Sequence, residues 1–418
     1  MHAEITRHAL DRVPLSLIID DSTLLVNLNY FFMRDRNLAD GGQRRWEDVP
    51  VVHPEWFTRA FGEWCLAQGV RGKFSVVPCP AALGRIDEGL PLFSRAQQDS
   101  WLAMCREVIA PAFDLTPEMI THTYVVDPAT CEPLPERIWE QYEWETLPVD
   151  REDLVHRYIA TACRILDNVG LTPQGVTSPG GFGGRTMAFY ARVAGEAVRE
   201  ATGAATPFFF KRVAEEGPVD TYVWEQDPAA GTAVGEVVAC TGDRTGSWTG
   251  YGVVDADYYL TEDLAGGRLA GVIDRGDPCI LCSHWQGFYG LHAGDQQGFA
   301  ALRTVVERLR QRDPHGERTA WRRTSEIATY ACAREMASLS VADDTLRLAL
   351  PVRAEGLTLR LDAPDVAGIA VNGVPLQRVE RKRDLASGTF WPTAEGTFLA
   401  FDPLAPECTV AIRRAASA

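Results

Sequence analysis

The sequence predicts an α/β barrel, irregular and seven-stranded, followed by a small antiparallel β-sandwich. Over residues 1–300, short apolar runs alternate with longer amphipathic segments, which is typical of β–α units around a parallel sheet. Near the C-terminus the pattern changes to alternation at period two, as at Leu346 and Leu348. Asn372 and Gly373 stand between two apolar stretches and indicate a two-residue hairpin. A barrel and a separate sandwich account for both patterns.

We expect the barrel in residues 1–336 and the sandwich in residues 337–418, with Asp150 capping the helix at 151–169. The predicted strands lie at residues 15–20, 74–78, 120–126, 175–178, 207–213, 221–225, 235–240 and 278–283. The predicted helices lie at residues 54–68, 96–113, 151–169, 185–201, 295–312 and 324–336.

Composition and charge narrow the functional classes. The chain has 41 basic against 57 acidic residues and a formal charge of −16, so we expect no nucleic-acid partner. No apolar stretch approaches the roughly 18 residues of a membrane span, and the first residues lack the apolar core of a signal peptide. The cysteines lie singly in apolar segments, as buried reduced thiols do. We therefore expect a cytoplasmic protein that does not bind membranes; its oligomeric state stays open.

Two adjacent carboxylates follow the first predicted strand. The apolar run Leu17-Ile18-Ile19 leads directly into Asp20 and Asp21. In a parallel barrel the carboxyl ends of the strands face the active site, so one carboxylate can bind a cation while the other acts as a base. A turn that caps the next helix is the alternative interpretation.

Three later segments carry further candidates. His122 lies among β-branched residues, where it is either a metal ligand or a hydrogen-bonded core residue. A glycine-rich loop follows the strand at 175–178 and contains Phe182 and Arg185; it predicts either close backbone approach to a ligand or a tight turn.

His284 ends the strand at 278–283 and can serve as a general acid. Beside it, the rings of Trp285, Phe288 and Tyr289 are suited to sugars or to packing at a barrel rim.

In chain order, these segments resemble the polysaccharide-deacetylase family over roughly residues 12–312. The resemblance implies a metal-dependent hydrolase that removes an acyl group from a carbohydrate or a related amide or ester. It implies zinc, or else nickel, cobalt or manganese, as the cofactor. The roles that it implies are Asp20 as catalytic base, His284 as acid, Asp21 and His122 as metal ligands, and Arg185, Phe182, Trp285 and Tyr289 as substrate-binding residues.

The sequence departs from the family's pattern of two histidines four residues apart. Position 126 is Val126, so a third protein ligand is expected from Asp127, His53 or His284.

Two other functions fit the same sequence. A metal-independent glycoside hydrolase would use a pair of carboxylates, for which Glu143 and Glu145 around Trp144 are the candidates. A barrel that binds carbohydrate without catalysis is the third possibility.

Overall fold

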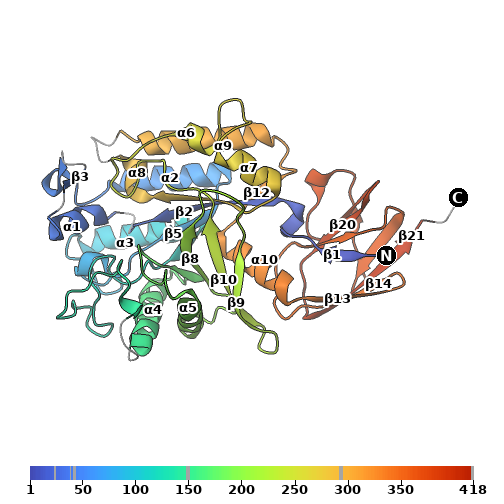
Figure 1. The fold of residues 1–418 in the computed structure, drawn as a ribbon, viewed down its shortest axis with the longest axis horizontal. Coiled ribbons are helices and arrows are strands. Elements are labelled where there is room, and N and C mark those ends of the chain that lie inside the picture. The colour runs from blue at the N-terminus through green and yellow to red at the C-terminus, as the bar shows by residue number, and fades with distance from the viewer. Residues whose placement is uncertain (23–24, 38, 41–43, 147–150, 291–294, 416–418) are drawn as a thin grey trace.

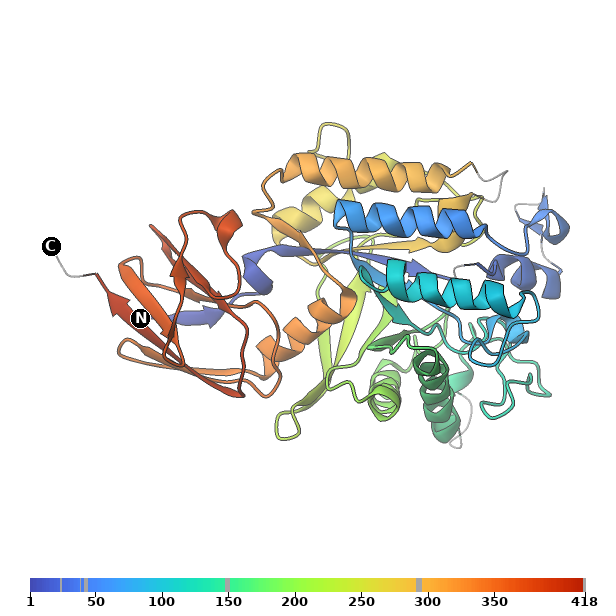
Figure 2. The ribbon, with the colours of Figure 1, turned by 180° about the vertical axis from the view of Figure 1, so that it is seen from behind.

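The computed structural model describes residues 1–22, 25–37, 39–40, 44–146, 151–290 and 295–415. An α/β part carries helices on both sides of its sheets, and a β domain lies at one end of the molecule (Figure 1). The opposite view shows α2 and α9 side by side on one face, and α4 and α5 together on the other (Figure 2). The protein is therefore an α/β protein with an additional β domain.

The α/β part contains two sheets. The first has the order β11-β2-β5-β6 with β12 also paired to β2, and its strands are all parallel. The second has the order β7-β8-β10-β9, with β9 antiparallel at its edge. Their bounds are β2 (Val13–Asp20), β5 (Gly72–Ser75), β6 (Phe113–Thr116), β7 (Gly175–Thr177), β8 (Phe208–Val213), β9 (Tyr222–Asp227), β10 (Thr232–Ala239), β11 (Cys279–His284) and β12 (Thr319–Trp321).

The two sheets adjoin at both edges without forming one continuous ladder. Thr177 donates its backbone N–H to Pro117 at 2.9 Å, and Cys240 donates to Ile280 at 2.7 Å. The first bond joins β7 to the residue after β6, where Glu118 and Thr177 also form an isolated parallel bridge, and the second joins the residue after β10 to β11. Closure into a seven-stranded barrel stays a prediction.

The helices follow the expected amphipathic segments. In α4, Tyr158, Ala162, Ile165 and Leu166 are buried at the predicted three- and four-residue spacing. Asp150, the expected cap, lies outside the described residues. The bounds are α1 (Leu28–Asp35), α2 (Glu55–Gln68), α3 (Arg95–Met104), α4 (Arg151–Asn168), α5 (Met187–Thr202), α6 (Ala256–Tyr259), α7 (Arg268–Arg275), α8 (Trp285–Tyr289), α9 (Gln297–Arg312) and α10 (Thr324–Met336). No helix among the described residues is long and apolar enough to cross a membrane.

The prediction of a strand at residues 120–126 is wrong. The strand that pairs with β5 is β6, which begins at the last residue of the helix predicted at 96–113. Residues 120–126 form a loop around the buried carboxylate of Glu140. That carboxylate accepts hydrogen bonds from the backbone N–H groups of Ile120, Thr121 and His122 at 3.2, 2.8 and 2.5 Å. A side chain therefore satisfies donors that a neighbouring strand would otherwise bind.

The β domain consists of two five-stranded sheets with the orders β1-β15-β20-β19-β18 and β13-β14-β21-β16-β17. The hairpin predicted at Asn372 and Gly373 is confirmed. It joins β16 to β17, and the two residues have φ values of 48° and 82°, as a two-residue turn of this kind requires. The bounds are β1 (Ala3–Ile5), β13 (Ser338–Ala342), β14 (Thr345–Ala349), β15 (Leu357–Leu361), β16 (Val366–Val371), β17 (Val374–Pro375), β18 (Gln377–Arg378), β19 (Thr389–Thr393), β20 (Gly396–Phe401) and β21 (Glu407–Arg414).

The first strand of the chain belongs to this domain. β1 pairs antiparallel with β15, with Ala3 opposite Leu361. The division at residue 336 stays a prediction for the rest of the chain.

Asp114 at the start of β6 predicts a pH dependence of stability. Its buried carboxylate accepts hydrogen bonds from the Ser325 N–H and hydroxyl at 2.7 and 2.8 Å, and burial raises its pKa from 3.8 to about 6. A raised pKa means that the contribution to stability is present below pH 3.8 and is lost as the pH rises through 6. Between pH 4 and 7 we expect the wild type to lose about 3 kcal/mol of unfolding free energy relative to Asp114→Asn, measured by denaturant titration. A constant difference across this range would contradict the expectation.

Candidate functional site

A pocket of about 260 Å³ opens at the carboxyl ends of the first sheet's strands. Asp21 directly follows β2, and His284 is the last residue of β11. The pairing of β2 with β11 places Asp20 opposite His284, so the two strands end at the same level. The pocket is lined by Asp21, Leu28, Asn29, Phe32, Arg36, His122, Gln141, Tyr142, Gly180, Trp248 and His284.

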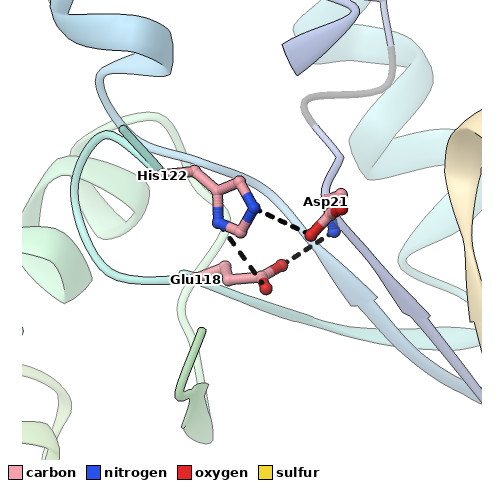
Figure 3. Close-up of side chains that lie close together, drawn as sticks. All are labelled: Asp21, Glu118 and His122. Carbon is pink, nitrogen blue, oxygen red and sulfur yellow. Dashed lines mark hydrogen bonds and ion pairs between the residues drawn. The ribbon is translucent and has the colours of Figure 1, made fainter. Parts of the chain in front are cut away.

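Asp21, Glu118 and His122 converge beside this pocket (Figure 3). The His122 Nε2 atom lies 2.8 Å from Asp21 Oδ1, and its Nδ1 atom lies 3.7 Å from Glu118 Oε1. Glu118 Oε2 also accepts a hydrogen bond from the Asp21 backbone N–H at 2.8 Å. One potential ligand atom from each residue lies within 4.8 Å of the others. The structure thus brings Asp21 and His122 together, with Glu118 as a third member.

Backbone geometry at the strand ends positions these side chains. Asp21 and His122 have φ values of 57° and 59°, in the left-handed region that non-glycine residues seldom adopt. The Glu140 carboxylate that holds the His122 loop also accepts a hydrogen bond from the hydroxyl of Tyr158, which is buried in α4. Strained backbone held by buried hydrogen bonds is common at functional sites.

The charges of Asp21, Glu118 and His122 shift one another's pKa values. Burial lowers the pKa of His122, but Asp21 and Glu118 raise it more, to about 9. Burial raises the pKa of Asp21, but His122 and His284 bring it down to about 2. Burial, and then the Asp20 charge, raise the pKa of Glu118 to about 7. Without a cation, a proton on His122 balances part of the carboxylate charge.

This set of side chains fits a divalent cation. Two carboxylates and one imidazole are ligands that zinc and similar ions accept in proteins. Within the described residues, the buried Nδ1 atom of His122 has no hydrogen-bond partner, and its Nε2 atom contacts a carboxylate. A cation bound between these groups would take the place of the proton on His122 and balance the carboxylate charges of Asp21 and Glu118.

His284 forms a second unit at the pocket. Its Nδ1 atom lies 2.8 Å from Asp243 Oδ2, and its backbone N–H donates to the same oxygen at 3.1 Å. Burial lowers the pKa of His284, but Asp21 and Asp243 raise it to about 10. Because Asp243 holds Nδ1, Nε2 is the ring nitrogen available for proton transfer.

The structure places Asp20 behind the pocket. Its carboxylate pairs with the ammonium group of Lys73, whose side chain is fully buried, and the Ser75 hydroxyl lies 3.4 Å from the same oxygen. Asp20 itself is 6% exposed and is not part of the pocket lining.

The residues expected to bind substrate lie elsewhere. Trp285 and Phe182 are fully buried, and Trp285 packs against Phe57 and Phe61. Tyr289 packs against Phe57, and exposed Arg185 pairs with Glu143 at 3.0 Å. None of the four expected residues lines the pocket.

Other side chains, which the sequence analysis did not select, line the pocket instead. The rings are those of Phe32, Tyr142 and Trp248. The Oδ1 atom of Asn29 and the Oε1 atom of Gln141 are buried and have no hydrogen-bond partner in the part of the chain that the structure describes. No sequence motif marks these residues.

The third member of the cluster is not one of the three expected ligands. His53 is buried against Trp285 and Tyr289, Asp127 is exposed, and His284 pairs with Asp243. Glu118 takes the position. It lies four residues before His122, whereas the sequence analysis searched four residues after it, at Val126. A carboxylate four residues before His122 was the feature of the sequence that could have identified this third member.

No family model matches this chain, and no curated protein matches it. The similarities to solved structures are weak. A family 30 endoxylanase from Clostridium papyrosolvens C71 is 7% identical, with a TM-score of 0.30 over 99% of this chain and 100% of that chain. A family 30 subfamily 8 xylanase from Clostridium acetobutylicum is 10% identical, with a TM-score of 0.29 over 99% of each chain. An endo-β1,6-glucanase is 9% identical, with a TM-score of 0.32 over 99% of this chain and 94% of that chain. Similarity at this level does not establish function, which is inferred from this protein's own side chains.

Proposed function

We propose that this protein is a metal-dependent hydrolase that removes an acyl group from a carbohydrate or a related amide or ester. Asp21, Glu118 and His122 would hold the divalent cation, which is zinc or a similar ion such as nickel, cobalt or manganese. The observation that carries the proposal is the convergence of these three side chains within 4.8 Å beside a pocket.

The pocket residues have roles that suit this reaction. A divalent ion held by the cluster supplies Lewis acidity that polarises a carbonyl group. His284, oriented by Asp243, donates a proton from Nε2 to the leaving amine or alcohol. Phe32, Tyr142 and Trp248 offer flat apolar faces to a sugar ring, and the unpartnered oxygens of Asn29 and Gln141 accept hydrogen bonds from substrate hydroxyl groups.

Asp20 remains the proposed base. Its carboxylate pairs with the ammonium group of Lys73 and would accept the proton that the attacking water releases as it adds to the carbonyl carbon. Asp20 is also close enough to Glu118 to raise the pKa of that residue. We further propose that the two adjoining sheets act as one irregular seven-stranded barrel, which brings the ends of β2, β6 and β11 to one mouth.

Glycoside hydrolysis without a metal is the rival function. It requires two carboxylates on either side of the scissile bond. Asp21 is the single carboxylate among the described residues that line the pocket. Glu143 pairs with Arg185 outside the lining, and the side chain of Glu145 lies outside the described residues.

Metal removal separates the two functions. The purified protein is expected to contain about one equivalent of a divalent metal by elemental analysis. Treatment with a chelator should abolish release of acetate from acetylated sugars and aryl acetates, and zinc, nickel, cobalt or manganese should restore it. Hydrolysis of aryl glycosides that persists in the metal-free protein would overturn the proposal and support the rival. Tight sugar binding with neither product would support a non-catalytic protein.

A further inference from the structure

A second cleft, of about 510 Å³, lies between the α/β part and the β domain. Pro14 and Asp114, which line it, lie at the amino ends of β2 and β6. Asp21 and Glu118 lie beyond the carboxyl ends of the same two strands. The cleft is therefore at the opposite end of the sheet from the candidate active site, and residues of α10 line it. Figure 1 shows β12 and α10 on the side of the α/β part where the β domain begins.

Arginine is the prominent residue of this cleft. Six arginines line it: Arg7, Arg12, Arg322, Arg323, Arg334 and Arg353. Arg7 pairs with Asp220 and Asp277, and Arg334 pairs with Glu335. The remaining four, which we call the cleft arginines, form no ion pair with a carboxylate in the part of the chain that the structure describes. In a chain with a formal charge of −16, four such cations around one cleft are unexpected.

The cleft arginines use few of their N–H donors within the protein. Arg12 donates Nη2 to the backbone oxygens of Lys382, Arg383 and Leu385, at 2.9, 2.9 and 3.4 Å, and its buried Nε atom has no partner among the described residues. Arg323 donates to the Pro111 oxygen at 2.8 Å, and Arg353 donates to the Leu404 oxygen at 3.0 Å. A guanidinium group has five N–H donors, so most of them remain for a ligand.

Two of the cleft arginines, Arg12 and Arg322, repel each other electrostatically. Burial, and then the charge of Arg322, lower the pKa of Arg12 more than Asp313, Glu317 and Asp11 raise it. Two cations close enough to disfavour each other are stabilised by an anion placed between them.

The acidic residues of the cleft mostly have other partners. Asp114 accepts hydrogen bonds from Ser325, and Asp220 pairs with Arg7. Glu326 pairs with Arg71 at 3.4 Å. Glu355 is the fourth, and it is exposed. Three of the four cleft carboxylates therefore have other hydrogen-bond or ion-pair partners, while Asp313, Glu317 and Asp11 act on Arg12 from outside the cleft lining.

We propose that this cleft binds a phosphorylated small molecule through the cleft arginines. The planar fork of guanidinium N–H groups matches phosphate oxygens, and a phosphate ester carries about −1.5 to −2 charges, which suits several arginines at once. The cleft volume is within the range of small-molecule sites, roughly 300–1,000 Å³. Because Arg322 precedes α10 and Arg353 precedes β15, the bound molecule contacts both parts of the protein and fixes one against the other.

Binding of inorganic pyrophosphate and glucose 6-phosphate tests this site. The full chain is first treated with chelator, so that phosphate cannot bind through a cation at Asp21, Glu118 and His122. Titration calorimetry at constant ionic strength should show saturable binding of at least one probe, and the melting temperature should rise with its concentration. Arg322→Gln and Arg353→Gln should each weaken binding at least tenfold. Arg347→Gln, the same change at an exposed residue of β14, should leave it unchanged.

Three results would overturn the site. The first is that neither probe binds, and the second is that citrate binds as tightly as the phosphates do. The third is that the Arg347→Gln control weakens binding as much as the cleft variants do. Arg353 is exposed, so its variant is expected to fold even where the Arg322 variant does not. The readout is binding to metal-free protein, so the hydrolase proposal can fail while this site stands, and the reverse holds too.

Discussion

The Glu118→Gln variant is expected to bind a divalent cation at least about 100-fold more weakly than the wild type, a larger effect than the 10–100-fold typical of residues that only support ligands. Glutamine keeps the size of the side chain and can still accept the hydrogen bond from the Asp21 N–H group. It removes one of two negative charges from the cluster, and the lost charge weakens the attraction for a divalent ion. The measurement is competition between the protein and a calibrated chelator, followed by elemental analysis.

The matched control is Glu143→Gln. Glu143 pairs with Arg185 outside the pocket lining, so its replacement should leave cation affinity unchanged. Retention of a full equivalent of metal by the Glu118 variant under competition would show that Glu118 is not a ligand. Asp21→Ala is expected to abolish binding, whereas Asp20→Asn is expected to keep the metal and lose turnover.

Replacing Lys73 with methionine is expected to lower the free energy of unfolding by about 3–5 kcal/mol, the cost typical of leaving one buried charge without its partner. Lys73 is fully buried, and its ammonium group contacts the Asp20 carboxylate and the Ser75 hydroxyl, the latter at 2.8 Å. Methionine fills a similar volume but leaves the carboxylate unpaired. Guanidinium chloride titration measures the loss.

A double variant and a surface control define the cause. Lys73→Met combined with Asp20→Asn removes both charges and should recover most of the lost stability. Lys382→Met breaks the more exposed ion pair with Asp11, and should cost about 1 kcal/mol or less. If the double variant were as unstable as the single one, lost packing rather than an unpaired charge would explain the effect.

Much of the fold was predictable because hydrophobic periodicity reports burial directly. β2 is buried at all of its positions and appears in the sequence as a nearly continuous apolar run. The hairpin at Asn372 was predictable because few residues adopt positive φ there. The loop at 120–126 was not predictable, because its β-branched residues favour a strand locally. The carboxylate of Glu140, which satisfies its N–H groups, is distant in the sequence.

The site was predictable where a side chain stands at a strand end, and His122 was identified from its side-chain chemistry although its predicted strand is a loop. Asp21 and His284 follow apolar strands, and the parallel sheet brings those ends together. Phe32 and Trp248 lie in α1 and in a segment after β10, with no pattern to mark them. Trp285 follows the same strand as His284 but points into the core, because adjacent residues at a strand end point in different directions.

The pairing of β1 with β15 has a consequence for how the chain folds as it is made. The segment Ala3–Ile5 is synthesised before the α/β part, and its partner Leu357–Leu361 is synthesised only after that part. The backbone N–H and C=O groups of β1 stay hydrogen-bonded to water until β15 has been synthesised and the two ends of this long chain segment meet. Completion of the β domain is therefore expected to follow synthesis of the α/β part, and a protease acting in that interval would find Ala3–Ile5 still unpaired.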